Sequence, residues 1–139
     1  MEPNHPGMEG TAYHTVLGRD LDATPQYLAT GAATCMAANR TSYFLNLTGP
    51  SLVVDTACSS AIVALHQAVR ALQIRDAGMA FLCGAKLIIN PDMFIPSTKL
   101  GFLSPDGRYK RFDISGNGYG RGEGVLALLL KPLEQAIYH

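Results

Sequence analysis

Cys58 stands where the residue pattern changes from strand-like to helix-like. Residues 52–61 read L-V-V-D-T-A-C-S-S-A, an apolar run followed by a tight turn of small residues. The helix predicted after the turn carries Ile62, Leu65, Val69 and Leu72 on one face. At the start of a helix, unpaired backbone N–H groups and the positive end of the helix dipole favour a thiolate. A thiolate is the form of cysteine that attacks carbonyl carbons.

The small residues around Cys58 leave room for a carbonyl group to approach the backbone. Ala57, Ser59, Ser60 and Ala61 are all small. The arrangement is analogous to the nucleophile elbow of α/β-hydrolases, although no glycine flanks Cys58. A lone cysteine in an apolar sequence is more often an inert, buried residue. Motifs elsewhere in the sequence are therefore needed to support a nucleophilic role for Cys58.

None of the four histidines is well placed to activate Cys58. His66 follows it by eight residues, which on a continuous helix is about 12 Å of axial rise, whereas a nucleophile and its base need about 3 Å. We therefore expect a packing role or a polar helix contact for His66. His5, His14 and His139 lie near the chain ends, and we expect no catalytic role for them.

Several stretches occur in an order shared with one enzyme family. They are A-N-R-T-S-Y-F at 38–44, G-P-S at 49–51, V-D-T-A-C-S-S-A at 54–61 with A-L-H-Q-A at 64–68, L-S-P-D-G-R at 103–108, F-D at 112–113 and G-Y-G-R-G-E-G at 118–124. From about Leu17 to Leu133, the chain resembles β-ketoacyl synthases, and most closely the ketosynthase domains of type I polyketide synthases. Residues 1–16 are expected to be an irregular lead-in that is not family-like, and residues 17–139 a partial β-ketoacyl synthase N-terminal domain.

This resemblance implies a partial thiolase-like α/β fold, the nucleophile-bearing half of a ketosynthase, with a sheet covered by helices. It implies an acyltransferase of the 3-oxoacyl synthase type, in polyketide or fatty-acid-like biosynthesis. Cys58 would accept an acyl chain as a thioester for decarboxylative condensation with a malonyl-carrier thioester. The implied partners are acyl and malonyl thioesters on the phosphopantetheine arm of a carrier protein, and a second copy in a homodimer. No metal or organic cofactor is implied.

Two histidine motifs that the family uses in decarboxylation, H-G-T-G-T and N-I-G-H, do not occur in these residues. The alternative hypothesis is therefore a truncated, catalytically incompetent ketosynthase remnant, or a fragment that docks onto a full ketosynthase through the dimer surface. A small cysteine hydrolase is a third hypothesis, which the placement of the histidines disfavours.

The composition fits one compact domain of 139 residues, with 47% hydrophobic and 16% charged residues. Eleven basic and eleven acidic residues cancel, so nucleic acid and anionic membranes are not expected as partners. Cys35, Cys58 and Cys83 are widely spaced and odd in number, which favours a reducing compartment. Residues 1–10 lack the pattern of a secretory signal, and no apolar run has the length of a membrane span. A cytoplasmic protein is expected.

The patterns predict helices and strands in alternation. Helices are expected at 29–44, from Cys58 to about 74 and at 133–138, and strands before Cys58 and at 79–83, 86–89 and 125–130. The continuous apolar strands predict a sheet that is covered on both faces. Asp55 and Thr56 are expected to fix the turn before Cys58. Charged residues such as Asp106, Asp113 and Glu123 are expected to organise the loop-rich stretch at 97–122, which lacks a nucleotide-binding glycine motif.

Overall fold

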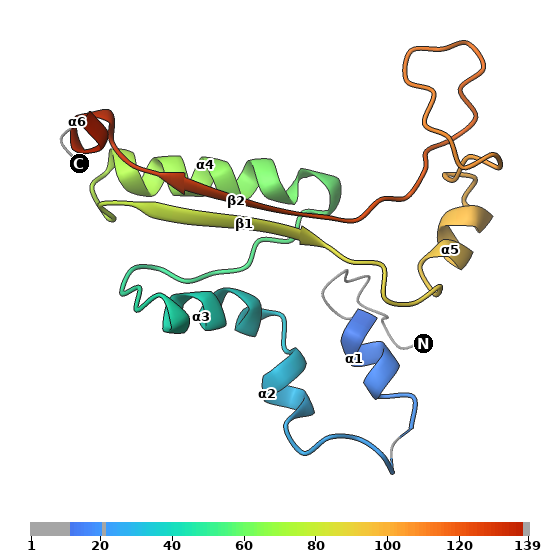
Figure 1. Ribbon diagram of the computed structural model, residues 1–139, viewed down its shortest axis with the longest axis horizontal. Helices are drawn as coiled ribbons and strands as arrows, with labels where there is room; N and C mark the ends of the chain where they lie inside the picture. Colours follow the sequence, from blue (N-terminus) through green and yellow to red (C-terminus); the bar gives the residue numbers. More distant parts are fainter. Residues whose placement is uncertain (1–11, 21, 138–139) are drawn as a thin grey trace, which may run out of the picture. The chain divides into compact units, whose positions relative to one another are not determined.

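The computed structural model describes residues 12–20 and 22–137 (Figure 1). Its elements, in chain order, are α1 (Ala12–Leu17), α2 (Leu28–Ala32), α3 (Cys35–Phe44), the short 3₁₀ helix η2 (Ala57–Ser59), α4 (Ser60–Gln73), β1 (Ala80–Lys86), α5 (Phe94–Lys99), β2 (Gly124–Leu130) and α6 (Leu133–Ile137). The chain divides into two compact units. The first comprises residues 1–85 and 125–139, and the second comprises residues 86–124.

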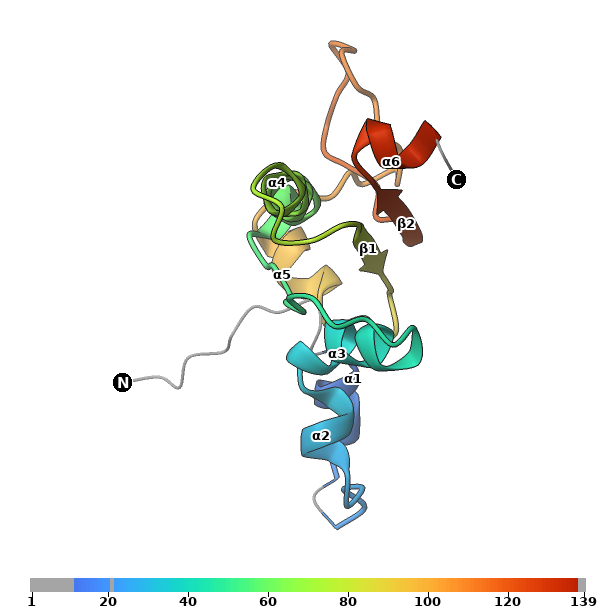
Figure 2. The same cartoon turned by 90° about the vertical axis from the view of Figure 1, so that its left-hand side faces the viewer.

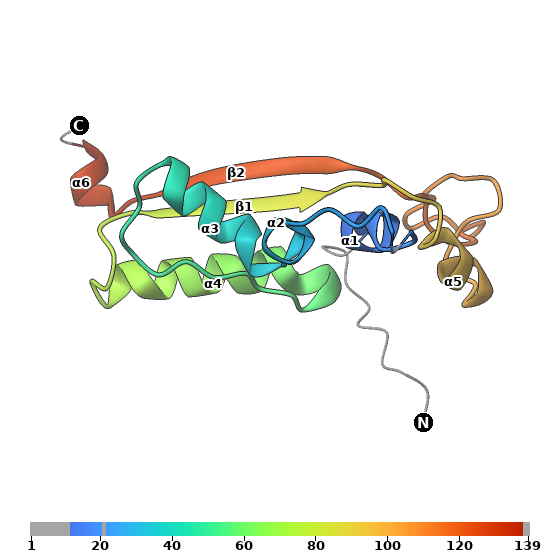
Figure 3. The ribbon, with the colours of Figure 1, turned by 90° about the horizontal axis from the view of Figure 1, so that it is seen from below.

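The first unit is built around a two-stranded sheet and α4. Strands β1 and β2 are hydrogen-bonded neighbours and run in opposite directions in Figure 1. Helix α4 lies beside the sheet in Figures 1 and 3, and Figure 2 shows it nearly end-on next to β1. Along β1, half-buried and exposed residues alternate. The strand therefore has one partly covered face and one exposed face, since successive side chains of a strand point to opposite sides.

Three helices end in the same hydrogen-bonded motif. After α4, Arg75 adopts a left-handed conformation with φ 60°. Its N–H donates to the Leu72 carbonyl at 3.2 Å, and the Asp76 N–H donates to the Ala71 carbonyl at 2.9 Å. This pair of bonds is a Schellman motif. The same pattern closes α3 with Asn46 at φ 52° and α5 with Gly101 at φ 70° in the left-handed position.

In the second unit, a long loop is held by an isolated parallel bridge between Leu103 and Tyr119. The Ser104 N–H donates to the Tyr119 carbonyl at 3.0 Å, and the Tyr119 N–H donates to the Phe102 carbonyl at 2.9 Å. Gly118, at φ 133°, makes this approach possible. A Cβ atom built there would lie 2.5 Å from the Ser104 nitrogen.

The structure corrects four of the element predictions. Residues 51–56 before Cys58 are irregular, because in the described chain no strand pairs with them. The single helix predicted at 29–44 is two helices, interrupted where Ala33 adopts an extended conformation with ψ 134°. Residues 87–89 are not a separate strand, since β1 itself continues to Lys86. The lead-in predicted as irregular contains α1, while residues 1–11 lie outside the described part.

Hydrophobic side chains in this chain remain largely accessible. Within the described residues no hydrophobic side chain is fully buried, whereas Ser97 and Ser104 are buried. Ile62, predicted for the core-facing side of α4, is 69% exposed, while Leu65 and Leu72 are half-buried. In the described residues, helices therefore cover the sheet only in part, with half-buried residues alternating with exposed ones along β1. No helix in the described residues has the length and apolar character needed to span a bilayer.

Candidate active site

Cys58 is the middle residue of η2, and α4 begins two residues later at Ser60. The thiol is free and exposed. This is the placement predicted for a nucleophile, at the transition from irregular backbone to helix. The helix dipole of α4, which has 14 residues, is therefore directed at the turn that carries Cys58.

Side-chain hydrogen bonds hold this turn on both sides of Cys58. The Asp55 Oδ1 atom accepts a hydrogen bond from the Ala57 N–H at 3.0 Å. The Ser60 hydroxyl accepts one from the Thr56 N–H at 2.8 Å and donates one to the Ala57 carbonyl at 2.7 Å. The Ser59 hydroxyl lies 2.7 Å from the Thr56 carbonyl, to which it donates. The expected roles of Asp55 and Thr56 in fixing the turn agree with these contacts.

The backbone N–H groups of the turn differ in their hydrogen-bond acceptors. Those of Thr56 and Ala57 donate to side chains, and those of Ser59 and Ser60 donate to the Thr56 and Ala57 carbonyls. The N–H of Cys58 has no hydrogen-bond partner in the described part of the chain. A free N–H on the residue that carries the nucleophile can stabilise negative charge that develops on an attacked carbonyl oxygen.

The other candidate residues do not join this site. His66 is exposed on α4 and shares no hydrogen bond or ion pair with Cys58. Cys35 lies at the first residue of α3 and Cys83 in β1; both are free and exposed. In residues 12–20 and 22–137, no group of three His, Cys, Asp or Glu side chains is arranged to hold a metal ion. His5 and His139 lie outside the described residues.

The acidic residues of the second unit hold its loop, as their expected structural role requires. Asp106 forms an ion pair with Lys110 at 2.6 Å and accepts a hydrogen bond from the buried Ser104. Lys110 and then Ser104 hold the pKa of Asp106 well below its ordinary value. The Ser115 hydroxyl and N–H, both 2.7 Å from Asp113 Oδ1, lower the pKa of Asp113. Glu123 accepts a hydrogen bond from the Ile88 N–H.

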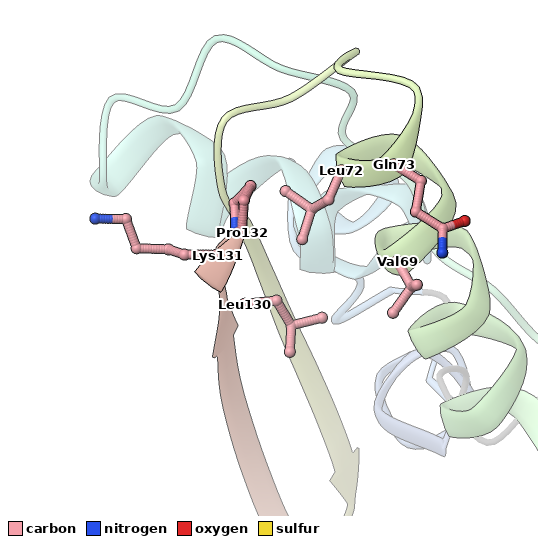
Figure 4. A pocket seen from close by; sticks show the side chains of 6 residues that line it. All are labelled: Val69, Leu72, Gln73, Leu130, Lys131 and Pro132. Atoms are coloured by element: carbon pink, nitrogen blue, oxygen red, sulfur yellow. The ribbon is translucent and has the colours of Figure 1, made fainter. Parts of the chain in front are cut away.

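A small apolar pocket of about 290 Å³ lies at the far end of α4 (Figure 4). Its walls come from the last turns of α4, the end of β2 and the two residues that follow β2, namely Val69, Leu72, Gln73, Leu130, Lys131 and Pro132. From Cys58 to Val69, a helical rise of 1.5 Å per residue gives about 16 Å. The pocket is therefore separate from the cysteine and does not form its substrate site.

Two features of the site were not predicted. Ala57 has a left-handed backbone with φ 56°, and alanine carries no sequence signal for this conformation. The hydrogen bonds of the Ser60 hydroxyl were not predicted either. The available signal was a pair of serines at a helix start, where serine commonly bonds backbone groups.

Comparison with known proteins places these motifs in one family. A family profile described as "Beta-ketoacyl synthase, N-terminal domain" matches residues 7–136. The match begins ahead of residue 17, where the sequence motifs predicted the domain boundary.

The curated relatives are large fungal synthases. The chain is 51% identical over 125 residues to a highly reducing polyketide synthase of Aspergillus niger, covering 90% of this chain and 5% of that protein. It is 49% identical over 133 residues to a hybrid PKS-NRPS synthetase of Penicillium oxalicum, covering 96% and 3%. The chain thus spans only a few per cent of the length of the relatives it matches.

Solved ketosynthase structures share the fold. The ketosynthase from module 6 of the bacillaene synthase of Bacillus subtilis matches with a TM-score of 0.76 and 44% identity, covering 78% of this chain and 20% of that one. An oxazolomycin ketosynthase domain of Streptomyces albus matches with a TM-score of 0.75 and 40% identity, covering 77% and 18%. These matches confirm the predicted partial thiolase-like α/β fold.

Proposed function

Because the chain belongs to the β-ketoacyl synthase family, we propose that it forms part of a polyketide-type ketosynthase in which Cys58 accepts the growing acyl chain. The observation that carries this proposal is the position of Cys58. Its thiol is exposed directly before α4, and its own N–H is free of hydrogen bonds to the described residues. Both groups are therefore available to one approaching thioester.

The proposed first step is a transfer between two thioesters. The thiolate of Cys58 attacks the carbonyl carbon of an acyl group held on pantetheine, and a new C–S bond forms. The Cys58 N–H donates a hydrogen bond to the carbonyl oxygen as negative charge develops there. The C–S bond to pantetheine then breaks, and the pantetheine sulfur leaves as a thiolate that takes up a proton. The acyl group remains on Cys58.

The second step is the condensation that the family resemblance implies. A malonyl thioester loses carbon dioxide, the resulting carbanion attacks the carbonyl carbon of the Cys58 thioester, and the cysteine leaves as a thiolate. We assign this step to a complete synthase of the kind the relatives represent, since the chain spans 3% and 5% of the length of two of them. Carrier-protein thioesters are accordingly the proposed substrates, with no metal or organic cofactor.

We also propose that the complete enzyme is a cytoplasmic homodimer. The three cysteines of this chain are all free, which is typical of a reducing compartment. Tyr43 is 90% exposed, Phe44 86% and Leu52 57%, and accessible aromatic and apolar groups of this kind favour burial against a second copy. Sedimentation of the complete synthase at several concentrations tests this proposal, and a monomer at all of them would contradict it.

Acyl transfer to Cys58 can be measured directly. The chain is incubated with an acetyl-pantetheine thioester, and the acetylated peptide is identified by mass spectrometry. We expect the label on Cys58, its absence in Cys58→Ala, and full labelling in the matched control Cys83→Ala, because Cys83 is equally a free, exposed thiol. Equal labelling of Cys58→Ala and the parent would overturn the assignment of Cys58.

A further inference from the structure

The residue before the proposed nucleophile has an unusual backbone. Ala57 adopts φ 56°, a left-handed conformation that residues with a Cβ atom rarely adopt outside glycine and asparagine positions. Such a conformation persists only where surrounding contacts hold it. Since Cys58 follows directly, whatever holds Ala57 also determines how Cys58 enters the helix.

The contacts that hold Ala57 come from both sides of it in the sequence. Its N–H donates to Asp55 Oδ1 at 3.0 Å, and its carbonyl accepts from the Ser60 hydroxyl at 2.7 Å. The same Ser60 hydroxyl accepts from the Thr56 N–H at 2.8 Å. Ser60 is half-buried at the first residue of α4. One hydroxyl therefore ties two backbone groups before Cys58 to the helix after it.

This arrangement also explains which backbone N–H group of the turn has no hydrogen-bond acceptor in the described chain. With Thr56 and Ala57 bonded to side chains and Ser59 and Ser60 bonded within the turn, Cys58 keeps its N–H free of any partner in the described chain. We infer that Ser60 is a positioning residue for Cys58. Its hydroxyl locks the left-handed turn at Ala57, so that the thiol and the free N–H of Cys58 stay together at the start of α4. The functional meaning of this role rests on the proposed function of Cys58.

Alkylation of the 139-residue chain by iodoacetamide tests this inference. The reaction at each cysteine is followed by peptide mass spectrometry, and the rate at Cys58 is divided by that at Cys35 in the same molecule. Without the Ser60 hydroxyl, Cys58 spends more time away from the start of α4, where the helix dipole favours attack by its sulfur. We expect the ratio to fall about two- to tenfold in Ser60→Ala, the range that modest hydrogen bonds give.

Three further variants separate positioning from general damage. Ser60→Thr keeps the hydroxyl and should keep the ratio within about twofold of the parent. Ser115→Ala removes another hydroxyl that closes a turn, on Asp113, and should leave the ratio unchanged. Ala57→Gly combined with Ser60→Ala should recover most of the loss, because glycine adopts the left-handed conformation without a lock. Circular dichroism checks that the helix content of each variant matches the parent.

The possible results are distinct. An unchanged ratio in Ser60→Ala overturns the positioning role, and so does a fall that glycine at position 57 fails to reverse. Alkylation needs no acyl donor, so the ratio reports on Ser60 even if Cys58 accepts no acetyl group. Failure of acetyl transfer to the parent Cys58 would instead overturn the proposed function.

Discussion

Gly118 provides the sharpest test of how the second unit is held together. In Gly118→Ala, the new Cβ atom would lie 2.5 Å from the Ser104 nitrogen and 2.6 Å from the Leu103 carbonyl carbon. Both are backbone atoms, and the Ser104 N–H donates to the Tyr119 carbonyl across the same bridge. The bridge therefore has to open to admit a methyl group.

The expected size of this effect follows from two contributions. A strained backbone conformation costs about 1–3 kcal/mol, and each lost backbone hydrogen bond adds about 0.5–1.5 kcal/mol. We expect local opening around residues 102–119 to become easier by about 2–4 kcal/mol. Since about 1.4 kcal/mol is a factor of ten, amide exchange there should accelerate at least roughly 30-fold, or reach the rate of an open chain.

Hydrogen exchange followed by mass spectrometry measures this effect, and the chain contains a matched control. At Gly122, a Cβ atom would meet nothing within 4 Å, so Gly122→Ala should leave exchange in residues 102–119 close to that of the parent. Exchange in Gly118→Ala within about twofold of the parent would refute the close approach between residues 103–104 and 118. Equal acceleration in both variants would show that the effect is not specific to this bridge.

Three other expectations concern separate parts of the chain. Arg75→Gly should raise the free energy of unfolding by about 0.5–1 kcal/mol in urea denaturation, because glycine suits the left-handed C-terminal position of α4; a loss of stability would contradict this. Lys110 and Ser104 lower the pKa of Asp106, so its stabilisation of the loop should be present above about pH 4 and be lost as the pH falls further. Acid should therefore weaken the protection of the loop from amide hydrogen exchange less in Asp106→Asn than in the parent chain. An equal loss of protection in both would contradict this role of Asp106. Without denaturant, dithionitrobenzoate should react with three thiols, because Cys35, Cys58 and Cys83 are all free and exposed. Reaction with fewer than three would contradict their exposure.

The parts of the fold that were predictable depend on local signals. Helix α4 follows from its amphipathic spacing, and its observed range, Ser60–Gln73, agrees with the predicted end near Ile74. Strand β2 follows from six consecutive apolar residues at 125–130. The start of α4 directly after Cys58 was also predictable, because strand-like and helix-like periodicities meet there.

The parts that were not predictable depend on segments distant in the sequence or on the backbone conformation of single residues. The apolar run before Cys58 carries a strand pattern, but a strand forms only where another strand pairs with it. The break at Ala33 depends on a single extended residue inside a helical pattern. The left-handed Ala57 has no compositional signal, since alanine is a helix former. The positioning role of Ser60 therefore depends on its hydrogen bonds to Thr56 and Ala57, which the sequence does not predict.

The accessibility of the hydrophobic side chains has a calorimetric consequence. Heat capacity rises on unfolding mainly because apolar surface becomes hydrated. In the described residues no hydrophobic side chain is fully buried, so unfolding exposes less new apolar surface than it does in a domain with a closed core. A scanning calorimeter should record a broad, low peak for this chain, with a heat-capacity step below the roughly 12–15 cal/mol/K per residue typical of globular domains.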